Sequence, residues 1–245
     1  MSILKSFLLF GKNFFFPSAC AVCKTGLLNA REIRYSLCDL CRISIVPVQG
    51  DKCLICGKPL ISEAGTCLPC RNSLQRSYDR LWVLFPYTGK FRKLLTSYKF
   101  AKNLTLADFF AEKLIEAIFN ESLPQDFAIV PVPPRPGKIK ETGWDQVDYL
   151  VKHMEKKLKC LPQAGEGKFV CRCLKRRKST AQKQLNRAER QENLKGRIFF
   201  NGAAVPSTAL IIDDVITTGS TIEICAQVLK QAGAKKVFAI CLFYD

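Results

Sequence analysis

The chain has 245 residues, of which 48% are hydrophobic and 24% are charged, so it contains enough apolar residues to form a core. This composition excludes a disordered or low-complexity protein, and no apolar run reaches the roughly 18 residues that cross a bilayer. The 38 Lys and Arg against 21 Asp and Glu give a net charge of +17, which favours an acidic or phosphate-rich partner.

The N-terminus begins with a short apolar run over residues 6–10. Gly11, Lys12 and Asn13 interrupt this run, and Pro17 stands where a lipoprotein signal needs a branched apolar residue. We therefore expect a short amphipathic helix that packs on the body of the protein, and a cytoplasmic location, rather than a secretory signal.

Four C-x-x-C pairs follow within the first seventy residues, separated by 14, 11 and 10 residues. Each pair places two thiolates on one tight turn, and two such turns supply four ligands to a tetrahedral Zn²⁺. The sequence therefore predicts two zinc sites; sequential pairing suits the spacing, although a crossed pairing or a redox role remains open. The predicted ligands are Cys20, Cys23, Cys38 and Cys41 for one site, and Cys53, Cys56, Cys67 and Cys70 for the other.

The segments between these cysteines are too short to bury a core of their own, so this part should depend on zinc for its fold. We expect one domain over residues 1–80, with the N-terminal helix and a double zinc ribbon, and a second over residues 81–245. Of the other cysteines, Cys225 and Cys241 stand in apolar runs and are expected in the core.

From residue 81 onward, strand-like and helix-like patterns alternate. The last three form a strand–helix–strand unit, which predicts an α/β domain with a parallel sheet. The expected elements are a helix that starts near Leu106 with Thr105 as its N-cap, a strand over 127–132, a helix over 145–159, a strand over 209–212, a helix over 220–232 closed by Gly233, and a strand over 237–243.

More than half of the net charge lies in residues 168–197, which contain eleven basic and two acidic residues. Such a cluster suits a nucleic acid, because each phosphate that it neutralises releases condensed counterions. The alternative is a solvated basic helix that only promotes solubility. The residues that we expect at a nucleic-acid interface are Lys175, Arg176, Arg177, Lys178, Lys183, Arg187 and Arg190.

The segment 210–221 joins an apolar strand to a helix through two acids and a turn rich in hydroxyl groups. Asp213 and Asp214 could accept hydrogen bonds from two ribose hydroxyls, and the helix start could bind a phosphate through its backbone N–H groups. Together they describe a site for a ribose 5-phosphate, with a capped helix and two solvated acids as the alternative. The phosphate-binding residues would be Thr217, Thr218, Gly219, Ser220 and Thr221.

Residues 210–221 resemble the phosphoribosyl pyrophosphate (PRPP) motif of type I phosphoribosyltransferases. Further segments resemble one branch of that group, the ComF competence-protein family: residues 87–100, the pair 131–134 and 143–146, and residues 179–193, in addition to the paired C-x-x-C turns. One position departs from the family pattern, because Thr142 stands where the family usually has Arg before the Gly-aromatic pair.

The resemblance implies a type I phosphoribosyltransferase-like α/β domain after a double zinc ribbon, with PRPP and Mg²⁺ as ligands. Arg135, Lys138 or Lys140 would hold the pyrophosphate. It also implies a competence factor that handles single-stranded DNA during DNA uptake, with the zinc ribbons as a docking surface for a helicase-like ATPase. Since four-thiolate zinc has no open position, a catalytic role for the ribbons is not expected.

The alternative function is an active transferase that moves the phosphoribosyl group from PRPP to a base, with Asp213 and Asp214 as its catalytic residues. No general base is evident, because His153, the single histidine, falls on the helix 145–159 and is expected to be structural. For the DNA-binding function, stacking platforms would be needed, and Phe91, Tyr98, Phe100 and Trp144 are candidates that could equally be core residues.

Overall fold

The computed structural model describes residues 18–72, 76–121, 126–161, 170–177 and 196–245; the expected N-terminal helix lies outside these ranges. The elements in chain order are α2 (Ala30–Tyr35), α3 (Asp39–Ser44), α4 (Leu68–Arg71), β1 (Arg80–Pro86), α5 (Gly89–Lys99), α6 (Leu106–Asn120), β2 (Phe127–Pro131), α7 (Lys138–Thr142), α8 (Gln146–Leu158), β3 (Leu174–Arg176), β4 (Ile198–Phe200), β5 (Thr208–Ile216), α10 (Ser220–Gln231) and β6 (Lys236–Tyr244).

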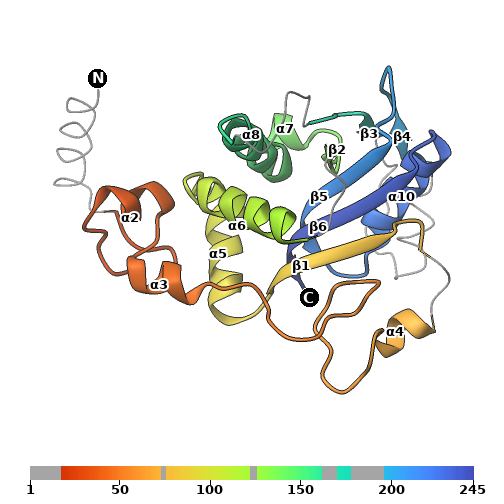
Figure 1. Ribbon diagram of the computed structural model, residues 1–245. Helices are drawn as coiled ribbons and strands as arrows, with labels where there is room; N and C mark the ends of the chain where they lie inside the picture. The colour runs from red at the N-terminus through yellow and green to blue at the C-terminus, as the bar shows by residue number, and fades with distance from the viewer. Residues whose placement is uncertain (1–17, 73–75, 122–125, 162–169, 178–195) are drawn as a thin grey trace.

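Four strands form one sheet in the order β1-β6-β5-β2, and all three neighbouring pairs are parallel. Strands β3 and β4 form a separate antiparallel pair. Parallel strands need helical connections that cover both faces of the sheet, and Figure 1 shows α5, α6 and α8 on one side of it and α10 on the other. The mixed α/β fold with a parallel sheet is thus confirmed.

Each face of the sheet has its own core, because successive strand residues point to opposite sides. Leu210 and Ile212 of β5 pack in one core with the apolar faces of α5, α6 and α8. Ala209 and Ile211 pack in the other core, with Cys225 of α10 and with β3 and β4. The prediction that Cys225 and Cys241 are core residues is confirmed, since both are fully buried.

The cysteine-rich segment packs against this α/β body rather than standing apart. Tyr35 and Leu37 belong to the first core, and Ile55 packs against the second. The hydroxyl of Tyr35 donates to the Glu112 carboxylate of α6 at 2.7 Å. One zinc-ribbon half is therefore attached to each face of the sheet.

The predicted helix and strand limits hold to within a few residues, with two differences. Thr105 occupies the N-cap position of α6, but its side chain caps no backbone N–H and donates instead to Asn103 Oδ1. Strand β5 does not end before the acidic pair, because it continues through Asp213 and Asp214 to Ile216, paired with β6. No helix among the described residues is long and apolar enough to cross a membrane.

Candidate functional site

The eight predicted zinc ligands gather into two groups of four, in the sequential pairing. Within each group the four Sγ atoms all lie within 4.8 Å of one another. The Sγ atoms of Cys23 and Cys38 are 3.6 Å apart, and those of Cys56 and Cys67 are 3.7 Å apart. Four sulfurs at the usual Zn–S length of about 2.3 Å lie about 3.8 Å from each other, so both groups fit tetrahedral zinc.

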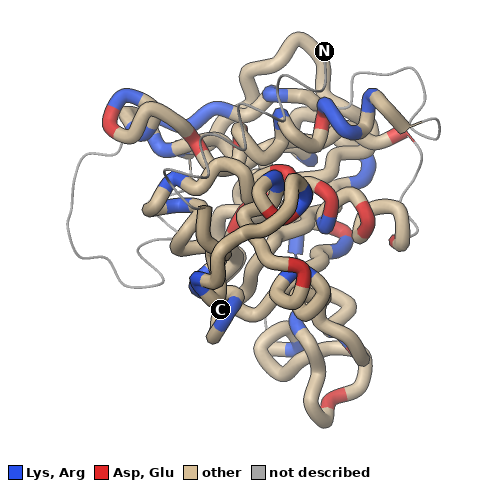
Figure 2. The backbone as a smooth tube through the Cα atoms, turned by 90° about the vertical axis from the view of Figure 1, so that its left-hand side faces the viewer, with Lys and Arg blue, Asp and Glu red and all other residues tan. Residues whose placement is uncertain are grey.

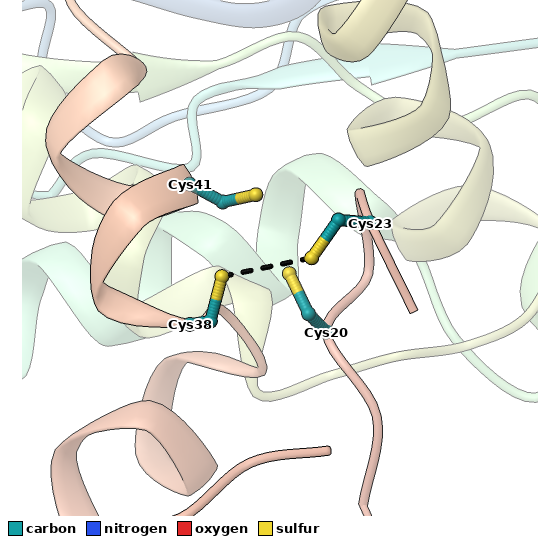
Figure 3. A group of neighbouring side chains, drawn as sticks. All are labelled: Cys20, Cys23, Cys38 and Cys41. Carbon is teal, nitrogen blue, oxygen red and sulfur yellow. Dashed lines mark hydrogen bonds between the residues drawn. The ribbon is translucent and has the colours of Figure 1, made fainter. Parts of the chain in front are cut away.

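The two sites are built in the same way. In each, one C-x-x-C pair lies on a turn, closed by hydrogen bonds from Lys24 N to Cys20 O and from Gly57 N to Cys53 O. The second pair begins a short helix, with Cys38 as the N-cap of α3 and Cys67 as the N-cap of α4. Figure 3 shows the four thiols of the first site pointing toward a common centre from the turn and from α3.

The thiols of the first site differ in how readily they ionise. Hydrogen bonds from the side chain and backbone of Thr25 lower the pKa of the Cys23 thiol to about 6, whereas burial raises the pKa of Cys38 and Cys41. A thiolate is the form of cysteine that binds zinc. With four sulfur ligands a zinc ion has no open position, so these sites are structural in kind.

A second candidate site lies at the carboxyl ends of β2 and β5. These strands are neighbours, with Pro131 opposite Ile212. The chain that follows β2 leads to α8 on one face of the sheet, and the chain that follows β5 leads to α10 on the other face (Figure 1). In open α/β sheets, the crevice at such a divergence is the usual ligand site.

The acidic pair lies at this crevice on β5. Asp214 is buried, and its Oδ2 forms an ion pair with Lys99 Nζ of α5 at 2.9 Å. The Asp213 residue as a whole is partly exposed, but its carboxyl group is buried, and its Oδ1 accepts a hydrogen bond from the backbone N–H of Asp214. Burial of its carboxyl and the nearby charge of Asp214 raise the pKa of Asp213 to about 8. The view of both residues as solvated loop acids is therefore wrong.

The turn after β5 places its hydroxyl groups at the start of α10. Gly219 is the N-cap with φ 76°, a left-handed conformation that glycine adopts without strain. The Thr218 and Ser220 hydroxyls are 2.9 Å apart, while Thr217 is exposed and Thr221 half-buried. The N–H of Ser220 donates to Thr218 Oγ1 at 3.3 Å. Since the first N–H groups of a helix have no intrahelical partner, the N–H groups that follow Ser220 and the hydroxyls are the donors that this turn offers.

The loop after β2 and α7 carry the three basic residues predicted for pyrophosphate. Arg135 forms a bidentate ion pair with Glu141. Lys138 Nζ donates to Asp145 Oδ2 at 2.6 Å, and Asp145 in turn caps α8. Lys140 is exposed and forms no ion pair within the described ranges.

Thr142 contributes no positive charge in place of the family's Arg. Its hydroxyl is 2.8 Å from the backbone carbonyls of both Lys138 and Trp144. It therefore closes the turn between α7 and α8.

A cleft of about 630 Å³ lies beside the loop after β2. It is lined both by residues predicted for pyrophosphate, Arg135 and Lys140, and by residues predicted for nucleic acid, Lys175 and Arg176. Its lining combines a proline-rich segment with basic side chains from the loop after β2, from α7 and α8, and from β3 and the residues before it. Two of these, Lys152 and Arg172, share Asp148 as an ion-pair partner. The cleft, which we call the basic cleft, is lined by residues 131–137, Ile139, Lys140, Asp148, Lys152, Arg172, Leu174, Lys175 and Arg176.

The other predicted nucleic-acid residues fall outside this lining. Arg177 lies over the ring of Phe199, with its guanidinium carbon 4.7 Å from the ring centre. Figure 2 shows that Lys and Arg also lie scattered over the side of the molecule that carries α2 and α3. Four predicted contacts lie outside the described residues: Lys178, Lys183, Arg187 and Arg190.

The aromatic candidates divide between core and surface. Tyr98 is fully buried, with Trp144 packed edge-on against it at 5.2 Å, and Phe91 stacks on Phe85. Phe100 is 75% exposed. His153 Nδ1 lies 2.9 Å from Asp108, between α8 and α6, which agrees with a structural role.

Sequence reasoning missed Lys99 and Asp145 as members of the crevice. Each pairs with a predicted site residue, Lys99 with Asp214 and Asp145 with Lys138. Both stand inside segments that resemble the ComF family, residues 87–100 and 143–146, so that resemblance was the available signal.

Comparison with known proteins agrees with this architecture. Residues 12–72 match the family model of the double zinc ribbon domain. The chain is 27% identical to the DNA utilization protein YhgH of Salmonella typhi over 223 residues, covering 84% of this chain and 96% of that protein. It is 26% identical to the competence protein ComFC of Streptococcus pneumoniae, covering 87% and 90%, and 23% identical to ComFC of Bacillus subtilis, covering 80% and 79%. The chain is thus a relative of the ComFC and YhgH proteins over most of its length, with a double zinc ribbon at its N-terminus.

Proposed function

We propose that this protein is a competence-type factor that binds single-stranded DNA during DNA uptake, and that it binds PRPP at the crevice between β2 and β5. The observation that carries the DNA-binding half is the basic cleft, where Lys140 and Lys175 are exposed and unpaired within the described residues. The names of the relatives, competence protein and DNA utilization protein, support a role in DNA uptake.

The cleft suits a strand of phosphates because its positive charge is incompletely neutralised. Among the described residues of the lining, Asp148 is the one acid, and it is shared by Lys152 and Arg172. Arg135 pairs with Glu141 outside the lining, and Lys140 and Lys175 have no ion-pair partner within the described ranges. Each further phosphate contact adds affinity through counterion release. The predicted contacts Lys178, Lys183, Arg187 and Arg190 follow Arg177 in the sequence and stay a prediction, because they lie outside the described residues.

The crevice supplies the groups that a ribose 5-phosphate requires. Asp213 and Asp214 offer carboxylates for the two ribose hydroxyls, and the turn from Thr217 to Thr221 offers donors for the phosphate. Mg²⁺ bound with PRPP would neutralise part of the pyrophosphate charge. Of the three basic residues predicted for that group, Lys140 has no ion-pair partner within the described ranges, whereas Arg135 pairs with Glu141 and Lys138 with Asp145.

Phosphoribosyl transfer to a base is the second candidate function, and the acidic pair at the crevice favours it. A transferase would stabilise the developing charge on the departing pyrophosphate. Arg135 and Lys138 are already paired with acids, so they offer little charge to stabilise the departing pyrophosphate. We therefore rank PRPP binding without turnover above phosphoribosyl transfer. Release of pyrophosphate from PRPP only in the presence of a purine or pyrimidine base would reverse this order.

DNA binding is tested by fluorescence anisotropy of a labelled oligothymidine with the zinc-loaded protein at several salt concentrations. Replacing Lys175 and Lys140 with Ala should weaken binding and reduce the slope of log K against log salt by about 1.4, since each lost single-strand phosphate contact changes it by about 0.7. The matched control is Lys235→Ala with Lys236→Ala, two exposed lysines far along the chain from the cleft that carry the same charge. An unchanged slope in the cleft variant would remove the cleft from the interface.

PRPP binding is tested separately by calorimetry in the presence of Mg²⁺. Asp213→Asn with Asp214→Asn should weaken PRPP binding by at least tenfold, about 1.4 kcal/mol, and leave two zinc ions per chain. Unchanged PRPP affinity in this double variant would exclude the assigned crevice. The affinity of the same double variant for oligothymidine shows whether DNA and PRPP depend on the same two carboxylates.

The helicase-like ATPase suggested by the family resemblance also stays a proposal. α3, in the first zinc-ribbon half, carries two exposed apolar side chains, Leu40 at 82% and Ile43 at 65%. Such side chains on a metal-stabilised helix suit a protein docking surface.

A further inference from the structure

A groove of about 880 Å³ lies between the first zinc-binding turn and α5, apart from the basic cleft. One wall is the C-x-x-C turn of the first site and the other is the outward face of α5. Its lining residues are Ala21, Val22, Cys23, Lys24, Gly89, Arg92, Lys93, Thr96, Ser97, Phe100 and Ala101. We call it the knuckle groove.

The charge of this groove has one sign. Lys24, Arg92 and Lys93 are exposed, and no acidic residue belongs to the lining. Within the part of the chain that the structure describes, none of the three forms an ion pair. The guanidinium of Arg92 does lie over the ring of Tyr87, 5.9 Å from its centre, a contact that keeps its positive charge. Three cations around one concave surface, without an acidic partner among the described residues, attract a polyanion.

The geometry of α5 explains why Arg92, Thr96 and Phe100 face the groove together. Arg92, Thr96 and Phe100 are four residues apart, so they follow one stripe of α5 and its C-cap. The opposite stripe, with Leu94, Leu95 and Tyr98, is buried in the core. The core therefore fixes the orientation of α5 and leaves Arg92, Phe100 and the adjacent Lys93 exposed to solvent.

Phe100 adds an apolar platform at one end of the groove. Its side chain is 75% exposed, although phenylalanine is usually buried. Stacking of a base on an exposed aromatic ring contributes about 1–3 kcal/mol, and single-strand binding sites combine such platforms with basic grooves. The groove has both components, the basic residues Lys24, Arg92 and Lys93 and the exposed ring of Phe100.

The opposite wall is held in place by the zinc site. Lys24 follows the ligand Cys23 directly and adopts φ 68°, with its N–H bonded to Cys20 O at 3.0 Å. A metal bound by Cys20 and Cys23 would fix the backbone of this turn and hence the position of Lys24 across from Arg92.

We propose that the knuckle groove is a second contact for single-stranded nucleic acid, with the phosphates along Lys24, Arg92 and Lys93 and a base stacked on Phe100. This inference rests on the proposed DNA-binding function and adds a site on the zinc-ribbon side of the molecule. It gives the first zinc site a role in holding one wall of a binding surface. A single strand fits better than a duplex, because a stacked base must be free of its partner.

The first test compares two pairs of charge-removing substitutions in the full-length, zinc-loaded protein by oligothymidine anisotropy across a salt series. Arg92→Ala with Lys93→Ala should weaken binding at least fivefold and reduce the salt slope by about 1.4. Lys235→Ala with Lys236→Ala carries the same charge change and should have no such effect. Zinc content and thermal unfolding of both variants establish that the fold is retained.

The second test locates the base. An oligonucleotide that contains 5-iododeoxyuridine is irradiated in the complex, and crosslinked peptides are mapped by mass spectrometry. A crosslink at Phe100 that disappears in Phe100→Leu supports the stacking platform. Crosslinks confined to residues around Lys175, with a normal salt slope in the Arg92 and Lys93 variant, would overturn this inference and leave DNA binding at the basic cleft intact.

The remaining outcomes separate the two proposals. Absence of oligonucleotide binding by the unmodified protein would overturn both. Binding of the unmodified protein that is lost in the groove variant but kept in the cleft variant would make the knuckle groove the main interface. A groove that binds an acidic peptide but no oligonucleotide would overturn the nucleic-acid assignment.

Discussion

Asp213 and Asp214 are adjacent in β5, yet their surroundings differ. The carboxylate of Asp214 has a fixed counterion, because Lys99 Nζ lies 2.9 Å from it. Asp213 has no ion-pair partner within the described ranges, and burial together with the charge of Asp214 raises its pKa to about 8. The raised pKa favours a proton on Asp213 when no cation is bound, and a cation beside the pair would lower that pKa and restore the carboxylate.

This difference predicts a pH-dependent effect of Asp213→Asn. The folded protein holds the Asp213 proton up to about pH 8, whereas an unfolded chain releases it near pH 4, so the free energy of unfolding falls as pH rises between these values. The variant lacks this titration and should gain stability relative to the unmodified protein between pH 5 and pH 8, by more than about 1.4 kcal/mol. Urea unfolding of both proteins at the two pH values measures this gain, and an equal stability difference at both would contradict the raised pKa.

The second zinc-binding turn packs closely against the backbone of β1. Gly57 closes that turn with φ 67°, and a Cβ at this position would overlap the backbone carbonyl of Leu81. Because backbone atoms cannot move aside as a side chain can, the turn can approach β1 only with glycine at this residue. This contact attaches the second zinc-ribbon half to the edge strand of the sheet.

Gly57→Ala should therefore destabilise the protein by at least about 2 kcal/mol, from left-handed backbone strain plus the overlap with Leu81. Gly65→Ala is the matched control, since Gly65 also has a positive φ, 72°, but only the side chain of Leu54 comes within 4 Å. We expect the control to cost about 1 kcal/mol. Thermal unfolding of the two variants side by side checks the prediction, which fails if their losses are equal.

At the scale of the whole molecule, the zinc-ribbon halves are part of the two cores. The first half contributes Tyr35 and Leu37 to the core that contains α6 and α8. Arg34 reinforces the attachment with an ion pair to Asp108 of α6 at 2.7 Å. Loss of zinc should therefore destabilise the α/β body as well as the cysteine-rich segment.

We predict two zinc ions per chain, one of which is lost in Cys38→Ala. Removing one of four ligands opens the first site and should lower the melting temperature and the near-ultraviolet signal of the aromatic core. Cys160→Ala is the control, because Cys160 is exposed and has no place in either ligand group. Elemental analysis gives the metal content, and two retained zinc ions in Cys38→Ala would contradict the assigned ligands.

Local sequence determined the features that depend on spacing along the chain. The C-x-x-C turns specify their ligands because a turn of four residues fixes two sulfurs close together, and the sequential pairing was the one that the spacing favoured. The apolar periods of α6, α8, α10, β5 and β6 likewise identified these elements, since burial of one face requires that pattern. The ends of these elements were harder to predict from the sequence. Strand β5, for example, continues past Asp214 to Ile216 because its last residues pair with β6.

Only the tertiary structure decided which distant residues meet. Asp214 meets Lys99 because Asp214, like Leu210 and Ile212 of the same strand, points to the face of the sheet that α5 covers. The knuckle groove depends in the same way on the packing of the first zinc-binding turn against α5. Spacing within a segment is set by covalent geometry, whereas contacts between segments are set by how the chain buries its apolar faces, which no local pattern specifies.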